Sequence, residues 1–136
     1  YQRNQLLDRI LEQAHQIHAD GKTSVIFTSR QELAFTDTQT RLNFGVAVSS
    51  LLMDIVRGLP DDIGFLISKG GITSNDVLSS GLALTSARLL GQILPGVSVV
   101  RSPADHPQFP NLPVVLFPGN VGDRDSLAAA YLRLVG

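Results

Sequence analysis

The chain has 136 residues, of which 43% are hydrophobic and 17% charged, so it is long and apolar enough to fold as a globular domain. Its formal net charge of −1 gives no sign of nucleic acid or an anionic membrane as a partner, and the absence of cysteine excludes disulfides, thiol catalysis and thiolate-bound zinc. No apolar run approaches the roughly 20 residues that span a bilayer, and no signal peptide opens the chain, so a cytoplasmic location is expected.

The first part of the chain predicts two long helices with a strand between them. Apolar residues recur at helical spacing over residues 2–20, and Gly21 follows as a helix stop. Residues 24–28, with three apolar residues at their centre, predict a short buried strand, and residues 29–40, which are polar and mixed, predict a loop. A second helix is expected over about residues 43–57.

The middle of the chain predicts a buried strand that leads into a glycine-rich turn. Residues 63–67 are apolar apart from one glycine, which is typical of a strand buried on both faces of a parallel sheet. The strand runs directly into residues 69–76, which contain two adjacent glycines. A short helix is then expected to about residue 82.

The remaining residues predict a hairpin, a loop, a last strand and a closing helix. The runs 87–93 and 97–101 flank a Pro-Gly turn, which indicates a hairpin and hence a mixed sheet. Residues 102–113 carry four prolines and predict a surface loop. The apolar run 114–117 predicts a strand, and residues 125–135 predict a helix.

Helices and strands therefore alternate, which predicts one α/β domain over residues 1–136, with a central mixed sheet of about five strands covered by helices. In such sheets ligands bind at the carboxyl ends of the strands, where the strand-to-helix loops collect. Three loops are expected at that edge. The chain opens at Tyr1 without an initiator Met, so we expect a piece of a longer polypeptide, although a processed chain would look the same.

The first of these loops begins at Lys69. Gly70 and Gly71 allow a sharp turn and the close approach of a ligand. Thr73 and Asp76 match a capping box, which would place a helix N-terminus directly after the glycines, where exposed N–H groups favour a phosphate. Lys69 could add a positive charge. The alternative is a tight turn with a capped helix and a solvated lysine.

The second loop contains Gly119, Asn120 and Gly122, residue types that accept left-handed backbone angles. Successive N–H groups in such turns can form a nest that binds an anion. Asp123 and Asp125 would compete with an anionic ligand or require a metal between them. A plain glycine turn with acidic caps remains the alternative.

The third loop is Thr28-Ser29-Arg30, whose hydroxyls and guanidinium could bind phosphate or ribose oxygens. An ordinary polar strand end is the alternative. Neither G-x-x-x-x-G-K-[ST] nor G-x-G-x-x-G occurs in the chain, so P-loop and Rossmann assignments are unsupported. The residues alone indicate an α/β domain with loops suited to anions. They do not identify an activity.

Taken together, the loops resemble the C-terminal, nucleotide-binding domain of the four-carbon acid sugar kinase family. The resemblance rests on the order and spacing of three segments: KGGITSNDVL at 69–78, LGQILPGV at 90–97 and VLFPGNVG at 115–122. Thr28-Ser29-Arg30 is also similar to the strand-end motif of that family. The resemblance covers nearly the whole chain.

The resemblance implies a function. Members of the family use ATP with Mg²⁺ to phosphorylate acids such as threonate or erythronate; their N-terminal domain binds the sugar acid and their C-terminal domain binds ATP. By position, the resemblance assigns nucleotide contacts to Ser29, Gly70, Gly71, Thr73, Gly119, Asn120 and Gly122. It also implies that the sugar-acid domain is absent from this chain. No catalytic base is named, and the isolated chain is expected to bind ATP or ADP weakly and to transfer nothing.

Two other functions are also compatible with the sequence. The chain could be a non-catalytic ligand-binding or interaction module that keeps the α/β shell, or a domain that binds a sugar phosphate with the same loops. His15 and His18 lie three apart on the first helix, but without a third ligand no metal site is expected. An apolar face on that helix, with Leu6, Ile10 and Ile17, could support a homo-oligomer.

Overall fold

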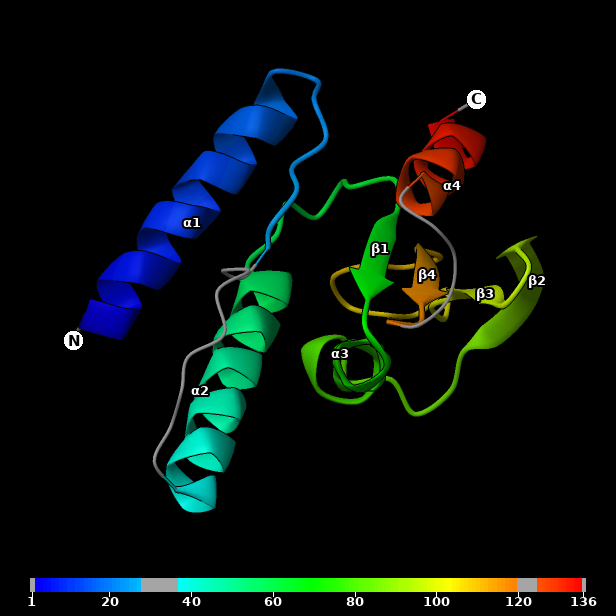
Figure 1. Cartoon of the computed structure of the whole chain (residues 1–136). Helices are drawn as coiled ribbons and strands as arrows, with labels where there is room; N and C mark the ends of the chain where they lie inside the picture. Colours follow the sequence, from blue (N-terminus) through cyan, green and yellow to red (C-terminus); the bar gives the residue numbers. More distant parts are fainter. Residues whose placement is uncertain (1, 28–36, 120–124, 136) are drawn as a thin grey trace. The chain divides into compact units, whose positions relative to one another are not determined.

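The computed structural model of the chain describes residues 2–27, 37–119 and 125–135 (Figure 1). The chain divides into two compact units, Tyr1–Pro60 and Asp61–Gly136. The first unit is helical and the second contains the sheet. No helix in the described part of the chain is long and apolar enough to cross a membrane.

The first unit contains α1 (Gln2–Ala19) and α2 (Thr38–Arg57). Helix α2 begins earlier than the sequence predicts because Asp37 caps it: the Asp37 carboxylate accepts a hydrogen bond from the Thr40 backbone N–H at 2.6 Å. That bond lowers the pKa of Asp37. Residues 38–40, which were expected in the preceding loop, therefore belong to the helix.

The strand expected at residues 24–28 is wrong over the residues described. Residues 24–27 are not in a strand, and Val25 and Phe27 are 71% and 79% exposed; Thr28 lies outside the described residues. An isolated strand leaves its backbone groups unpaired, and none of the sheet strands pairs with this segment. The described sheet therefore has four strands where about five were expected.

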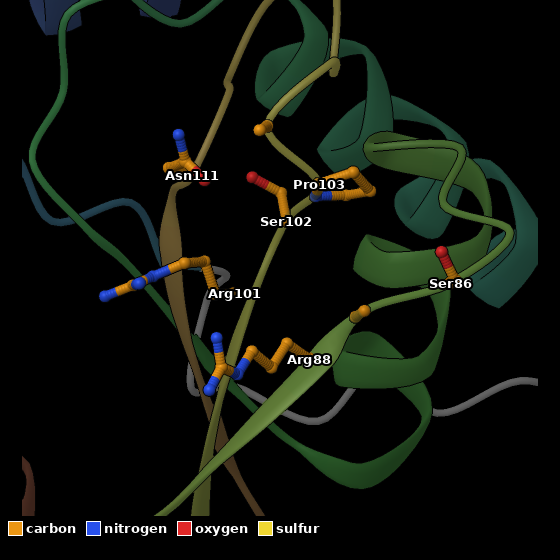
Figure 2. A pocket seen from close by; sticks show the side chains of 8 residues that line it. Ser86, Arg88, Arg101, Ser102, Pro103 and Asn111 are labelled. Carbon is orange, nitrogen blue, oxygen red and sulfur yellow. The ribbon is translucent and has the colours of Figure 1, made fainter.

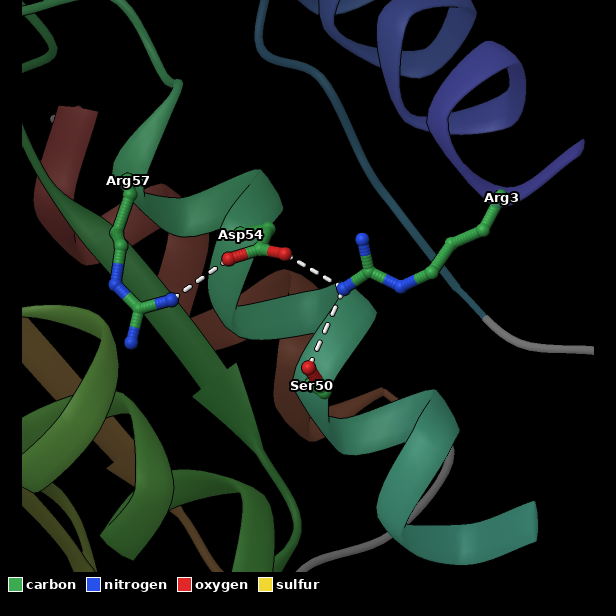
Figure 3. A network of polar contacts seen from close by, with 4 residues as sticks. All are labelled: Arg3, Ser50, Asp54 and Arg57. Carbon is green, nitrogen blue, oxygen red and sulfur yellow. Dashed lines mark hydrogen bonds and ion pairs between the residues drawn. The ribbon is translucent and has the colours of Figure 1, made fainter. Parts of the chain in front are cut away.

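Polar contacts tie the two helices of the first unit together (Figure 3). The Arg3 guanidinium donates to Asp54 Oδ2 at 2.6 Å and to Ser50 Oγ at 3.3 Å, while Arg57 donates to Asp54 Oδ1 at 2.7 Å. The hydrogen bond from Arg3 lowers the pKa of Asp54. The resulting stabilisation is present above the ordinary pKa of an aspartate and is lost as the pH falls through the lowered value.

The sheet of the second unit is mixed, as predicted. Its strands are β1 (Leu66–Lys69), β2 (Arg88–Leu94), β3 (Val97–Arg101) and β4 (Pro113–Phe117), in the order β1-β4-β3-β2. Strands β1 and β4 are parallel, whereas β3 is antiparallel to both of its neighbours. The α/β class and the β2–β3 hairpin are confirmed. Strand β1 overlaps the expected strand at 63–67 but begins only at Leu66.

Three helical segments accompany the sheet. Strand β1 leads into α3 (Gly71–Asp76), which continues into the π-helical turn η1 (Val77–Gly81), and the chain closes with α4 (Ser126–Val135). Helix α4 buries Ala130 against Val97, Val115 and Phe117, none of which is more than 1% exposed. This core fixes the end of β4, from which one of the predicted glycine loops departs.

Candidate functional site

Two predicted loops leave the sheet at one edge. Strands β1 and β4 are neighbours and point the same way (Figure 1), and their register places Lys69 opposite Phe117. Both strands end at these residues. The two following turns therefore start side by side; residues Lys69–Thr73 and Phe117–Gly119 are called the glycine edge below.

Gly70 makes the turn from β1 into α3. Its φ is +114°, an angle that side chains rarely permit, so glycine is required here. The Gly70 N–H donates to the Phe117 carbonyl at 2.7 Å, and the Gly70 carbonyl accepts from the Ser74 N–H at 2.8 Å. One glycine thus links the ends of both strands to the first turn of α3.

The predicted capping box at Thr73 and Asp76 is wrong. Helix α3 begins at Gly71, with Gly70 as its N-cap, so Thr73 and Asp76 both lie inside the helix. The helix starts right after the first glycine because the Gly70 carbonyl already accepts the first helical hydrogen bond, from Ser74. The predicted start of the helix lies close to the observed one, but the N-cap is Gly70 and not Thr73.

The start of α3 carries backbone N–H donors that have no acceptor within the helix. The first N–H groups of a helix have no intrahelical acceptor, which here concerns Gly71, Ile72 and Thr73. Gly70 has no side chain with which to cap them. Thr73 Oγ1 lies close to the turn, since a Cβ built on Gly70 would be 3.5 Å from it. Backbone donors and one hydroxyl therefore gather at one point, as phosphate binding requires.

The two turns approach each other through their backbones. A Cβ built on Gly119 would lie 3.8 Å from the Gly70 Cα. The Lys69 ammonium lies 5.1 Å from the centroid of the Phe117 ring, within the range of a cation–π contact. The edge thus combines two residues without side chains and one exposed positive charge.

A pair of buried serines, neither of them predicted as a site residue, anchors α3 to β1. Ser74 Oγ lies 3.2 Å from the Ser68 carbonyl and 3.1 Å from Ser68 Oγ. Ser68 and Ser74 are only 5% and 7% exposed. The signal that could have found them is a serine at the end of a buried strand and another in the first helical turn after it.

The structure brings four of the seven predicted contact residues to the glycine edge: Gly70, Gly71, Thr73 and Gly119. Ser29, Asn120 and Gly122 lie outside the described residues, so their roles remain predictions. In the described ranges no group of three or more His, Asp or Glu side chains is placed to hold a metal ion. His15 instead lies with Nε2 2.8 Å from the Gly58 carbonyl.

Comparisons with known proteins show the family and the fold of the chain. A family model described as a nucleotide-binding C-terminal domain matches residues 1–127. No curated protein matches the chain. A solved domain of unknown function (DUF1537) from Bordetella bronchiseptica, a domain-swapped dimer with bound citrate, is similar with a TM-score of 0.58 and 16% identity. The match covers 90% of this chain and 30% of that one, and at this identity it shows the fold alone.

Proposed function

Because the chain belongs to the family of nucleotide-binding C-terminal domains, as the resemblance of its loops indicated, we propose that it binds ATP through the glycine edge. The observation that carries this proposal is the meeting of Gly70 and Gly119 beside the start of α3, which no side chain caps among the described residues. Glycine turns at a helix start offer backbone N–H groups to an anion without a Cβ in the way.

In the proposed complex, the N–H groups of Gly71, Ile72 and Thr73 donate to phosphate oxygens. The missing side chains at Gly70 and Gly119 leave room for those oxygens, and the Lys69 ammonium offsets part of their charge. Mg²⁺ enters with the nucleotide and neutralises further phosphate charge. We propose no protein ligand for it.

We further propose that the whole protein is a kinase for four-carbon sugar acids of the threonate or erythronate type. Phosphoryl transfer relies on positioning and electrostatic stabilisation of the transferred group. The glycine edge can contribute to both, but none of its residues is a base for a substrate hydroxyl. We therefore assign the sugar acid and its base to a separate N-terminal domain. The match to only 30% of its structural neighbour supports such an arrangement.

Calorimetric titration with ADP and ATP, each with Mg²⁺, tests the binding proposal. The key variant is Gly119→Val, because an added Cβ there makes only an ordinary contact at 3.8 Å and the fold should tolerate it. The valine methyls would fill the gap between the turns, so binding should weaken at least about tenfold, which is about 1.4 kcal/mol. Gly64→Val is the matched control, since nothing lies within 4 Å of its Cβ.

The alternatives predict other outcomes. A parent chain that binds neither nucleotide would favour a non-catalytic interaction module. Sugar phosphates that displace ATP from the parent would favour a sugar-phosphate domain. Detectable phosphorylation of threonate by this chain alone would contradict the assignment of the sugar acid to another domain.

We also propose that the chain self-associates through its first unit. Of the apolar residues expected on the contact face of α1, Leu6 is 42% exposed and could contact a second copy, whereas Ile10 and Ile17 are half-buried. Light scattering over a wide concentration range checks this, and a monomer throughout would contradict it.

A further inference from the structure

A pocket lies at the opposite end of the strands from the glycine edge. A pocket of about 380 Å³ is formed where β2 begins and β3 ends, together with the loop that follows β3 (Figure 2). Arg101 pairs with Pro113, the first residue of β4, whereas the glycine edge follows Phe117, the last. The pocket therefore lies at the opposite end of β4 from the glycine edge and does not belong to that site.

Two arginines dominate the pocket. Arg88 and Arg101 are directly opposite each other in the β2–β3 register, which puts both side chains on one face of the hairpin. Figure 2 shows both guanidinium groups extending to the same side of the view. None of the lining residues is acidic. Within the part of the chain that the structure describes, neither arginine forms an ion pair.

This arrangement is costly unless something else neutralises it. Like charges directly opposite on neighbouring strands destabilise a sheet. In addition, Arg101 Nε is shielded from solvent and has no hydrogen-bond partner among the described residues. A buried N–H donor without an acceptor loses its hydration and gains nothing in return. Both features indicate a missing acceptor that carries negative charge.

The wall of the pocket is held in place by the loop after β3. Ser102 Oγ accepts from the Leu112 N–H at 2.8 Å and donates to the Phe109 carbonyl. Asn111, with φ +55°, donates its N–H to the Pro103 carbonyl at 3.2 Å. These bonds fix the backbone that faces the arginines before any ligand arrives, which lowers the entropic cost of binding.

His106 secures the same loop from outside the pocket. Its Nδ1 accepts from the Phe109 N–H at 2.8 Å, so the proton of the neutral ring is on Nε2, which donates to the Leu82 carbonyl at 2.7 Å. Its ring also stacks on that of Phe109, with 6.0 Å between centroids. The histidine thus serves the loop and is not a ligand-binding group.

We propose that this pocket binds a small oxyanion, a carboxylate or a phosphate, between the guanidinium groups of Arg88 and Arg101. Guanidinium groups match the planar and bidentate geometry of such anions, and the buried Nε supplies a donor with a fixed direction. The volume of about 380 Å³ suits a small molecule. This site is independent of nucleotide binding at the glycine edge.

Calorimetric titration of the chain with inorganic phosphate and, separately, with malonate tests the proposal. The parent should show saturable binding of at least one anion. The anion with the higher affinity shows whether the pocket prefers a phosphate or a carboxylate. Arg88→Met and Arg101→Met should each weaken binding at least about tenfold. Arg101→Lys, which keeps the charge but removes the Nε donor, should fall between parent and Arg101→Met.

Two controls locate the anion. Arg133→Met removes an arginine that bonds the Ile93 carbonyl elsewhere in the same unit, and should leave anion binding unchanged. Gly119→Val should also leave it unchanged. Because Arg88 is exposed, its methionine variant should fold even if the Arg101 variant does not. The proposal is overturned if the parent binds neither anion, if Arg133→Met weakens binding as much as Arg88→Met, or if only Gly119→Val abolishes it.

Discussion

The two ends of the strands suit anions by opposite means. The glycine edge presents backbone N–H groups beside residues without side chains, and it rests on Phe117, which is 1% exposed. The pocket at the other end presents two guanidinium groups on a hairpin whose outer strand carries the 68% exposed Leu89. One site is part of the packed core of its unit, and the other is added to its rim.

This difference has an energetic consequence. Backbone donors at a helix start carry only partial charges, so the glycine edge is stable when empty. The arginine pocket holds two full positive charges and one buried donor with no hydrogen-bond partner among the described residues, so its own groups lower the free energy of unfolding. Substitutions at the glycine edge should therefore lower the free energy of unfolding, whereas removal of an arginine from the pocket should raise it.

The largest effect is expected from Phe117→Ala. This truncation removes a buried ring from the core beneath the glycine edge, and should lower the free energy of unfolding by about 3–5 kcal/mol. Leu89→Ala, on the exposed strand beside the arginine pocket, should change it by less than about 0.5 kcal/mol. Urea denaturation of both variants measures the contrast, and equal losses would remove the distinction between core and rim.

Gly70→Ala should cost about 1–3 kcal/mol, because a side chain is strained at φ +114°. Its control is Gly64→Ala, at a position with open space around the Cβ and no positive φ. Thermal unfolding monitored by circular dichroism compares the two. A Gly70→Ala variant as stable as Gly64→Ala would show that the turn between β1 and α3 differs from the one described.

Arg101→Met should raise the free energy of unfolding by about 1 kcal/mol when no phosphate or carboxylate is present. It removes a buried donor that has no partner in the described ranges, together with one of two facing positive charges, while keeping an apolar stem. Arg133→Met, which loses an exposed hydrogen bond, should not be stabilised. Denaturant titration in a buffer free of oxyanions measures both, and a destabilised Arg101→Met would mean that Arg101 is already satisfied.

The smallest effect is expected from Lys69→Gln. Lys69 is exposed, so its contribution to phosphate binding should be about 0.2–1 kcal/mol, or roughly a 1.4-fold to fivefold loss of ATP affinity. Phosphate binding at the arginine pocket should not change. Calorimetry with each ligand checks both statements, and an equal loss for both ligands would indicate that they share one site.

The sequence predicted the glycine edge well because its features are local. Glycines after an apolar run indicate a turn at a strand end, and the two turns come together because β1 and β4 are parallel neighbours. The predictions were wrong where two local patterns compete. Asp37 caps α2, so that helix begins earlier than predicted, and Gly70 is the N-cap of α3 in place of Thr73. The strand predicted at 24–28 is wrong over the described residues 24–27, because a strand needs a neighbouring strand to pair with and no local pattern shows whether there is one.

The arginine pocket could not be predicted in this way. Arg88 and Arg101 are separated by a hairpin, and only the register of β2 and β3 makes them neighbours. That register contains irregularities between Leu89 and Gly91 and between Gln92 and Leu94, so counting back from the Pro-Gly turn does not pair the two arginines.

The most direct test of ATP binding at the glycine edge is a ¹H–¹⁵N correlation spectrum of the chain during titration with ADP and Mg²⁺. Backbone donation to phosphate predicts that the amide signals of Gly71, Ile72 and Thr73 move first and furthest, while those of Arg88 and Arg101 stay in place. Shifts centred on Arg88 and Arg101, with the start of α3 unchanged, would contradict it.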